Sequence, residues 1–93
     1  MAKLTDAEVE QRLQGVPAWT RAGEAIERDV KLEDFAAAIA LVNAVAKLAE
    51  AANHHPDILV HGWNRVRLTL STHSEGALTK ADFDLAGEID RAV

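Results

Sequence analysis

Two segments of this 93-residue chain alternate apolar and polar side chains, and this pattern constrains the fold more than any other feature. The segments are residues 25–32 and 65–71, and Arg28 is the one polar residue at an apolar position. The apolar positions are Ile26, Val30, Leu32, Val66, Leu68 and Leu70. Because successive side chains of a β-strand point to opposite faces, each segment is predicted to be a strand with one buried face.

A shorter extended segment is predicted beside each of these strands. Residues 21–23 indicate a turn, which joins the strand at 25–32 to a short extended segment after Trp19. Residues 57–64 predict another short strand, with Gly62, Trp63 and Asn64 near its turn. Strands joined by short connections pair in antiparallel fashion, so we expect a four-stranded antiparallel sheet.

Helices are predicted at both ends of the chain. Thr5 with Glu8, and Thr79 with Asp82, match the capping-box pattern, in which the first side chain accepts from the backbone of the second. Apolar residues at helical spacing follow each pattern.

A long central helix is predicted after Asp34, a suitable N-cap, and it ends where Asn53 and Pro56 follow. One apolar stripe is expected to face a core and consists of Phe35, Ile39, Val42, Ala46 and Ala49. The stripe beside it consists of Leu41, Val45, Leu48 and Ala52.

The order of elements is therefore helix, two strands, helix, two strands, helix. This order predicts an α+β fold with two layers, in which the helices cover one face of the sheet. No linker or low-complexity segment interrupts the chain, so residues 1–93 are expected to form a single domain.

Composition excludes several classes of function. There is no cysteine, which rules out disulfides, thiolate nucleophiles and cysteine-bound zinc. The net charge of −5 argues against nonspecific nucleic-acid binding, which relies on clustered basic residues. The first residues lack a signal-peptide pattern, and no stretch is expected to span a membrane, so a cytoplasmic location is expected.

All four histidines fall between residues 54 and 73. The unperturbed pKa of histidine, roughly 6.5, lies near working pH, so the cluster suggests general acid–base catalysis. Glu50, one helical turn before His54, is placed to orient an imidazole. Alternatively, His54 and His55 donate to the last carbonyls of the central helix. A metal site is not expected, because adjacent imidazoles diverge and no His-x3-His pair exists.

The order Glu50-x3-His54-His55-Pro56, then Trp63, then Val66-Arg-Leu-Thr-Leu-Ser-Thr-His73, closely resembles the pterin-4a-carbinolamine dehydratase family. The resemblance covers nearly the whole chain from about Trp19 onward. It implies a hydro-lyase that dehydrates 4a-hydroxytetrahydrobiopterin to the quinonoid dihydropterin in tetrahydrobiopterin recycling. No separate cofactor is implied.

The resemblance also assigns roles to individual residues. His54, His55 and His73 would be the acid–base groups, with His54 and His73 handling the hydroxyl and the N5 proton. The residues that would bind the pterin or orient the histidines are Glu50, Trp63, Ser71, Thr72 and Asp82. For Trp63 a core anchor is the competing interpretation, and for Ser71 and Thr72 an ordinary strand position.

Two departures from the family pattern accompany the resemblance. Six residues, 57–62, separate Pro56 from Trp63 where the family has five, which suggests a bulge or a longer turn and adds His61 near the site. Asn53 replaces the acidic residue expected before the histidine pair.

Members of the family also act as oligomeric partners, and this leaves a rival function. A non-catalytic assembly or dimerisation cofactor of the same fold would not need the three histidines, so their presence favours the enzyme. Exposed edge strands of the sheet predict a homodimer or homotetramer.

Overall fold

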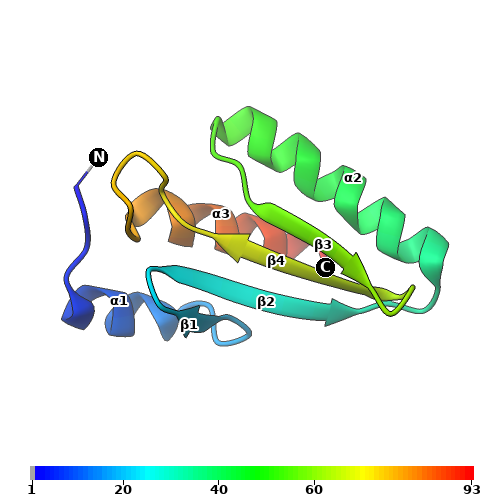
Figure 1. Cartoon of the computed structure of the whole chain (residues 1–93), viewed down its shortest axis with the longest axis horizontal. Helices are drawn as coiled ribbons and strands as arrows, with labels where there is room; N and C mark the ends of the chain where they lie inside the picture. The colour runs from blue at the N-terminus through cyan, green and yellow to red at the C-terminus, as the bar shows by residue number, and fades with distance from the viewer. Residues whose placement is uncertain (1) are drawn as a thin grey trace.

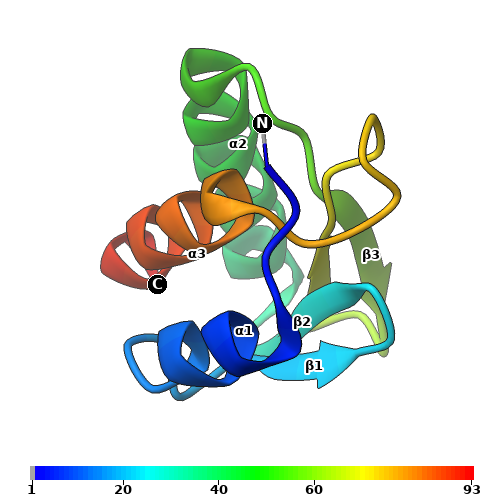
Figure 2. The same ribbon diagram turned by 90° about the vertical axis from the view of Figure 1, so that its left-hand side faces the viewer.

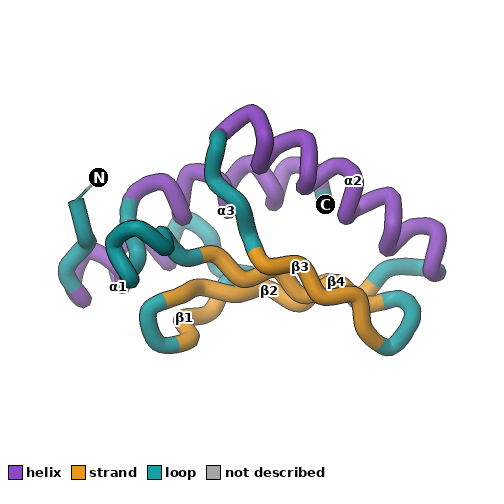
Figure 3. Tube along the Cα trace, turned by 45° about the horizontal axis from the view of Figure 1, so that its top comes forward, coloured by secondary structure: helices purple, strands orange, loops and turns teal. Residues whose placement is uncertain are grey.

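The computed structural model describes residues 2–93 and has the predicted order of elements (Figure 1). The elements are α1 (Asp6–Leu13), β1 (Thr20–Ala22), β2 (Ala25–Lys31), α2 (Phe35–Ala52), β3 (Asp57–His61), β4 (Arg65–Leu70) and α3 (Lys80–Ala92). The strands form one antiparallel sheet in the order β1-β2-β4-β3. The helices lie on one face of this sheet, as Figures 2 and 3 show. The predicted two-layer α+β fold is confirmed.

The alternation in β2 and β4 sets which face of the sheet the helices cover. The central pair aligns Ile26 with Leu70 and Val30 with Val66. The buried residues of these two strands are Ile26, Val30, Val66, Leu68 and Leu70. The polar residues that alternate with them along each strand, such as Asp29 and Arg67, lie on the opposite face of the sheet, which no helix covers.

Arg28 occupies an apolar position because it has a specific partner beneath the sheet. Its Nη1 donates to Oδ1 of Asp90 on α3 at 2.6 Å, and the indole Nε1 of Trp19 donates to the same oxygen at 2.8 Å. Trp19 is 3% exposed. This cluster ties β2, α3 and the segment before β1 together, and it pairs a charge that would otherwise be buried alone.

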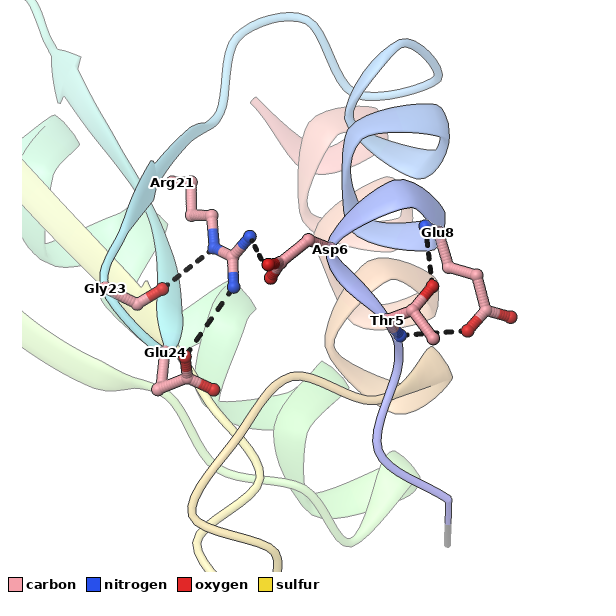
Figure 4. Close-up of polar contacts among 6 residues, drawn as sticks. All are labelled: Thr5, Asp6, Glu8, Arg21, Gly23 and Glu24. Atoms are coloured by element: carbon pink, nitrogen blue, oxygen red, sulfur yellow. Dashed lines mark hydrogen bonds and ion pairs between the residues drawn. The ribbon is translucent and has the colours of Figure 1, made fainter.

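The predicted helix caps are present. In α1, Glu8 N–H donates to Thr5 Oγ1 at 3.2 Å and Thr5 N–H donates to Glu8 Oε1 at 2.9 Å (Figure 4). Ala37 N–H donates to Asp34 Oδ1 at 2.7 Å at the start of α2. Figure 4 also shows Arg21 of β1 bound to Asp6 of α1, which fixes the hairpin against the first helix.

The prediction for the core-facing side of α2 is wrong for most of its stripe. Phe35 is 54% exposed and Ile39 36%, whereas Ala38, Leu41, Val45 and Ala49 are buried. The helix is apolar around most of its circumference, so periodicity alone does not identify the side that packs on the sheet. An apolar stripe of α2 therefore faces outward.

The apolar character of α2 also bears on the membrane prediction. By length and mean hydropathy, 1.6 over 18 residues, this helix is long and apolar enough to cross a membrane, although no stretch of the sequence is expected to span one. It is nevertheless a weak span candidate, because one side of the helix packs on β4 and α3 as part of the hydrophobic core.

Candidate active site

The register of β3 and β4 brings three segments to one end of the sheet. Asp57 at the start of β3 pairs with Thr69 near the end of β4. The turn after α2, the loop after β4 and the start of α3 therefore lie at the same end, on the left in Figure 1. This end holds His54, His55 and His73, together with Thr72 and Asp82.

His54 is held by Asp82. The imidazole Nε2 lies 2.5 Å from Asp82 Oδ1, and the two side chains are 14% and 0% exposed. Isolated buried carboxylates are costly, so a buried Asp82 requires hydrogen-bond donors on both of its oxygens. The second oxygen, Oδ2, accepts from Thr72 Oγ1 and from Thr79 N–H, both at 2.9 Å.

Thr79, which the sequence identifies only as a helix cap, is also a member of this cluster. Its hydroxyl lies 2.7 Å from the hydroxyl of Thr72, and Thr79 is 0% exposed. The capping box at the start of α3 thus uses Asp82 twice, once to cap the helix and once to hold His54. The signal available in sequence was the capping box next to a histidine-containing loop.

The conformation of the chain at the end of α2 determines that His54 contacts Asp82 and that His55 contacts Glu50. Asn53 takes the left-handed conformation (φ 50°), which a short polar side chain tolerates better than most. The chain thereby leaves the helix, and His54 N–H closes it by donating to Ala49 O at 3.1 Å. The helical four-residue spacing from Glu50 to His54 is therefore lost.

Glu50 contacts His55 instead of His54, which corrects the sequence expectation. Glu50 Oε2 lies 2.5 Å from His55 Nε2, and both side chains are exposed. The helix-capping interpretation of the two histidines is also not what the structure shows, because backbone groups of Asn53 and His54 close the helix. The side chains of His54 and His55 are bound to carboxylates.

The loop after β4 presents His73 to solvent. Thr72 and Ala77 form an isolated antiparallel bridge, and His73 O accepts from Gly76 N–H inside the turn that the bridge closes. His73 is exposed, whereas Ser71 donates its hydroxyl to Glu24 O at 2.7 Å. The hydroxyls of Ser71 and Thr72 are thus both engaged within the protein.

Trp63 does not lie with the histidines. It occupies the turn between β3 and β4 with φ 57°, and it is 63% exposed, so the core-anchor interpretation is wrong. The six residues of β4 separate this turn from Thr72 by roughly 20 Å at ~3.3 Å per residue. The expected pocket-lining position next to His54 is therefore not formed within one protomer.

His61 is also far from the site, contrary to the expectation that the extra residue brings it near. It pairs with Arg65 at the Trp63 end of the sheet, and its Nε2 lies 2.9 Å from Asp29 Oδ2 on the uncovered face. The pairing of β3 with β4 is regular throughout, so the extra residue is accommodated in the turn at 62–64 and not in a bulge.

A cavity of about 310 Å³ adjoins His54 between the end of α2 and the first turns of α3. Its other lining residues are Ala52, Lys80, Ala81, Asp84, Leu85 and Glu88. Residues 2–93 contain no group of three or more histidine, aspartate and glutamate side chains arranged to hold a metal ion. The chemistry that this end of the sheet offers is proton transfer by imidazoles held on carboxylates.

Comparison with known proteins agrees with the predicted family and the predicted fold. The family model described as "Pterin 4 alpha carbinolamine dehydratase" matches residues 2–92. A protein of Acidobacterium capsulatum named "Putative pterin-4-alpha-carbinolamine dehydratase" is 53% identical over 90 residues, covering 97% of each chain. A protein of the same name from Nocardia farcinica is 54% identical over 87 residues, covering 94% of this chain and 90% of its own.

Two solved structures share the fold. A "transcriptional coactivator/pterin dehydratase" from Brucella melitensis superposes with a TM-score of 0.91 at 34% identity and covers 97% of both chains. A "pterin dehydratase-like protein" described as a RuBisCO assembly factor of the alpha-carboxysome has a TM-score of 0.67 at 23% identity. It covers 80% of this chain and 87% of its own, and it shows the fold alone. By sequence and by fold, this chain belongs to the pterin 4 alpha carbinolamine dehydratase family.

Proposed function

We propose that this protein dehydrates a 4a-hydroxytetrahydropterin, such as 4a-hydroxytetrahydrobiopterin, by histidine acid–base catalysis. The C4a–O bond breaks as an acid protonates the departing hydroxyl, which leaves as water. A base takes the proton from N5, and a C4a–N5 double bond forms to give the quinonoid dihydropterin. Both groups must exchange protons near neutral pH, which is the range where imidazole serves either role.

The observation that carries this proposal is the His54–Asp82 pair. Asp82 is fully buried with donors on both oxygens, so its position is set by the fold and not by solvent. An imidazole hydrogen-bonded to such a carboxylate keeps one ring orientation, which general acid–base catalysis requires. No comparable constraint acts on the exposed His55–Glu50 pair.

Placement at the same end of the sheet supports the roles that the family resemblance implies for the remaining residues. His73, on an exposed loop next to Thr72, would exchange the second proton with His54 as its counterpart. His55, held by Glu50, would assist or bind the pterin. Ser71 and Thr72 would contribute chiefly by backbone groups and by support of the loop, because their hydroxyls are already engaged.

Stopped-flow dehydration of 4a-hydroxytetrahydrobiopterin tests the proposal. The unmutated protein is expected to accelerate the reaction over buffer, and His54→Ala and His73→Ala are each expected to lower kcat by roughly 10²–10⁴-fold. His61→Ala is the matched control, since His61 also contacts a carboxylate but lies at the other end of the sheet.

The outcomes separate the activity from the residue roles. No acceleration by the unmutated protein would reject the enzyme. Unchanged rates in both site variants would reject the histidine assignment while leaving the reaction in place. A loss in His61→Ala equal to that in His54→Ala would show that the losses are not specific to the site.

We further propose that the protein works as a homodimer or homotetramer in the cytoplasm. Two features support self-association. The edge strand β3 carries a half-exposed Leu59, and α2 turns Phe35 and Ile39 outward, so apolar surface remains on the isolated protomer.

A further inference from the structure

We propose that His54 exchanges protons through Nδ1, because Thr72, Thr79 and Asp82 commit its Nε2–H to a permanent hydrogen bond. In this arrangement Thr72 and Thr79 are positioning residues: they touch Asp82 and act on His54 through it. The catalytic consequence rests on the proposed dehydratase function, whereas the protonation pattern of His54 is a property of the free protein.

The two oxygens of Asp82 are not equivalent. Oδ2 accepts from a backbone N–H, that of Thr79, which can never act as an acceptor. The same oxygen accepts from the hydroxyl of Thr72. Oδ2 is therefore saturated by two donors from fixed elements, and only Oδ1 remains for His54.

The direction of the threonine hydrogen bonds follows from counting protons. A hydroxyl has one proton to donate, and Thr72 donates it to Asp82. The 2.7 Å contact between the two hydroxyls must then use the proton of Thr79, with Thr72 as acceptor. The chain of donors runs from Thr79 to Thr72 to Asp82, inside a cluster whose threonines and aspartate are all buried.

This chain determines the protonation of His54. Nε2 and Oδ1 are 2.5 Å apart, so a proton lies between them, since two facing lone pairs would repel. The proton that can come and go is then the one on Nδ1. Within residues 2–93, Nδ1 has no hydrogen-bond partner, and His54 keeps 14% of its side-chain surface exposed beside the cavity. The charged groups around that cavity are Lys80, Asp84 and Glu88.

Asp82→Asn tests this arrangement because the donors on Oδ2 determine how the new amide is oriented. Its oxygen must face Thr72 and the Thr79 N–H, which places its NH₂ group against His54 Nε2. Nε2 must then be an acceptor, so neutral His54 is forced into the Nδ1–H form. Wrong-tautomer substitutions of this kind preserve geometry but lower kcat by as much as about 10⁴-fold.

The measurement is nitrogen-15 NMR of the four imidazoles in substrate-free protein across a pH titration. In the unmutated protein, His54 is expected in the Nε2–H form, with Nδ1 as the nitrogen that gains a proton on acidification. In Asp82→Asn, neutral His54 is expected in the Nδ1–H form. An Nδ1–H form in the unmutated protein, or no change of tautomer in a folded Asp82→Asn, would overturn the proposal.

Asp29→Asn is the matched control. It removes the carboxylate of the other histidine–aspartate pair, on the uncovered face of the sheet, and is expected to change the signals of His61 only. A change of the His54 tautomer in this variant would count against a local effect of Asp82. The titration of the unmutated protein tests the assignment even if Asp82→Asn does not fold.

The role of Thr72 as a positioning residue has its own test. Thr72→Val is expected to lower kcat with KM unchanged, and Thr72→Ser, which restores the donor, is expected to recover kcat. A raised KM with kcat unchanged would show that the hydroxyl binds substrate instead. If the NMR result is the expected one but the protein has no dehydratase activity, the His54 assignment stands and only the proposed function is rejected.

Discussion

Two acidic side chains of α3 organise polar clusters beneath the sheet. Asp82 joins the start of α3 to the loop after β4 and the turn after α2, and Asp90 joins its last turns to β2 and Trp19. At these two points the elements are joined by hydrogen bonds to a carboxylate and not by apolar packing alone. At the scale of single residues, much of the polar order of this small protein depends on these two carboxylates.

Asp90→Ala is expected to lower the free energy of unfolding by about 1–3 kcal/mol, because it leaves the guanidinium of Arg28 and the indole N–H of Trp19 without their acceptor. Equilibrium unfolding in urea measures the change. Asp84→Ala is the control, since its ion pair with Lys80 is exposed, and it is expected to cost less than about 0.5 kcal/mol. Equal losses in both variants would contradict the role of Asp90.

At the scale of elements, local signals place the helix starts, and long-range packing decides the sides that they bury. All three predicted caps lie where the capping side chains indicate, at Thr5, Asp34 and Thr79. The buried side of α2 was mispredicted, because both of its stripes are apolar and only contact with the sheet distinguishes them.

The cap of α1 predicts a pH dependence. The backbone N–H of Thr5, followed by its hydroxyl, holds the pKa of Glu8 below its ordinary value of 4.5. A carboxyl whose pKa is lowered on folding stabilises the folded state at pH values above 4.5, and this contribution is lost as pH falls through the lowered pKa.

Glu8→Gln is therefore expected to reduce the loss of stability between about pH 6 and about pH 3, because the glutamine does not titrate. Urea unfolding at the two pH values measures the difference, with Glu10→Gln, outside the capping box, as the control. A loss as large in Glu8→Gln as in the unmutated protein would contradict this account.

At the scale of the whole molecule, the sheet separates residues that the sequence grouped together. The chain turns between β3 and β4, so residues on either side of β4 lie at opposite ends of the sheet. His54 and His73 lie at one end of the sheet although nineteen positions separate them in the sequence. Trp63, which lies between them in the sequence, is at the other end.

Trp63→Ala is accordingly expected to leave the KM for the 4a-hydroxytetrahydropterin unchanged. A substrate held at His54 is separated from Trp63 by the length of β4, roughly 20 Å. Steady-state kinetics measure KM, with His61→Ala as a control from the same end of the sheet. A raised KM would contradict the prediction and place the indole beside the substrate.

The mass in solution tests the proposed self-association. A homodimer or homotetramer is expected, because the protomer leaves the β3 edge and the outward stripe of α2 uncovered. Size-exclusion chromatography with light scattering measures the mass. The mass of one chain, 10.1 kDa, would refute the expectation.

The sequence by itself determined the elements, their order and the layered fold, and it identified the histidine cluster as the candidate site. These follow from periodicity and caps, which are properties of neighbouring residues. Only the tertiary structure decided that Asp82 holds His54, that Glu50 holds His55, and that Trp63 and His61 lie elsewhere. The reason is that such pairings depend on the register of the sheet and on one left-handed residue, Asn53, whose effects extend across the molecule.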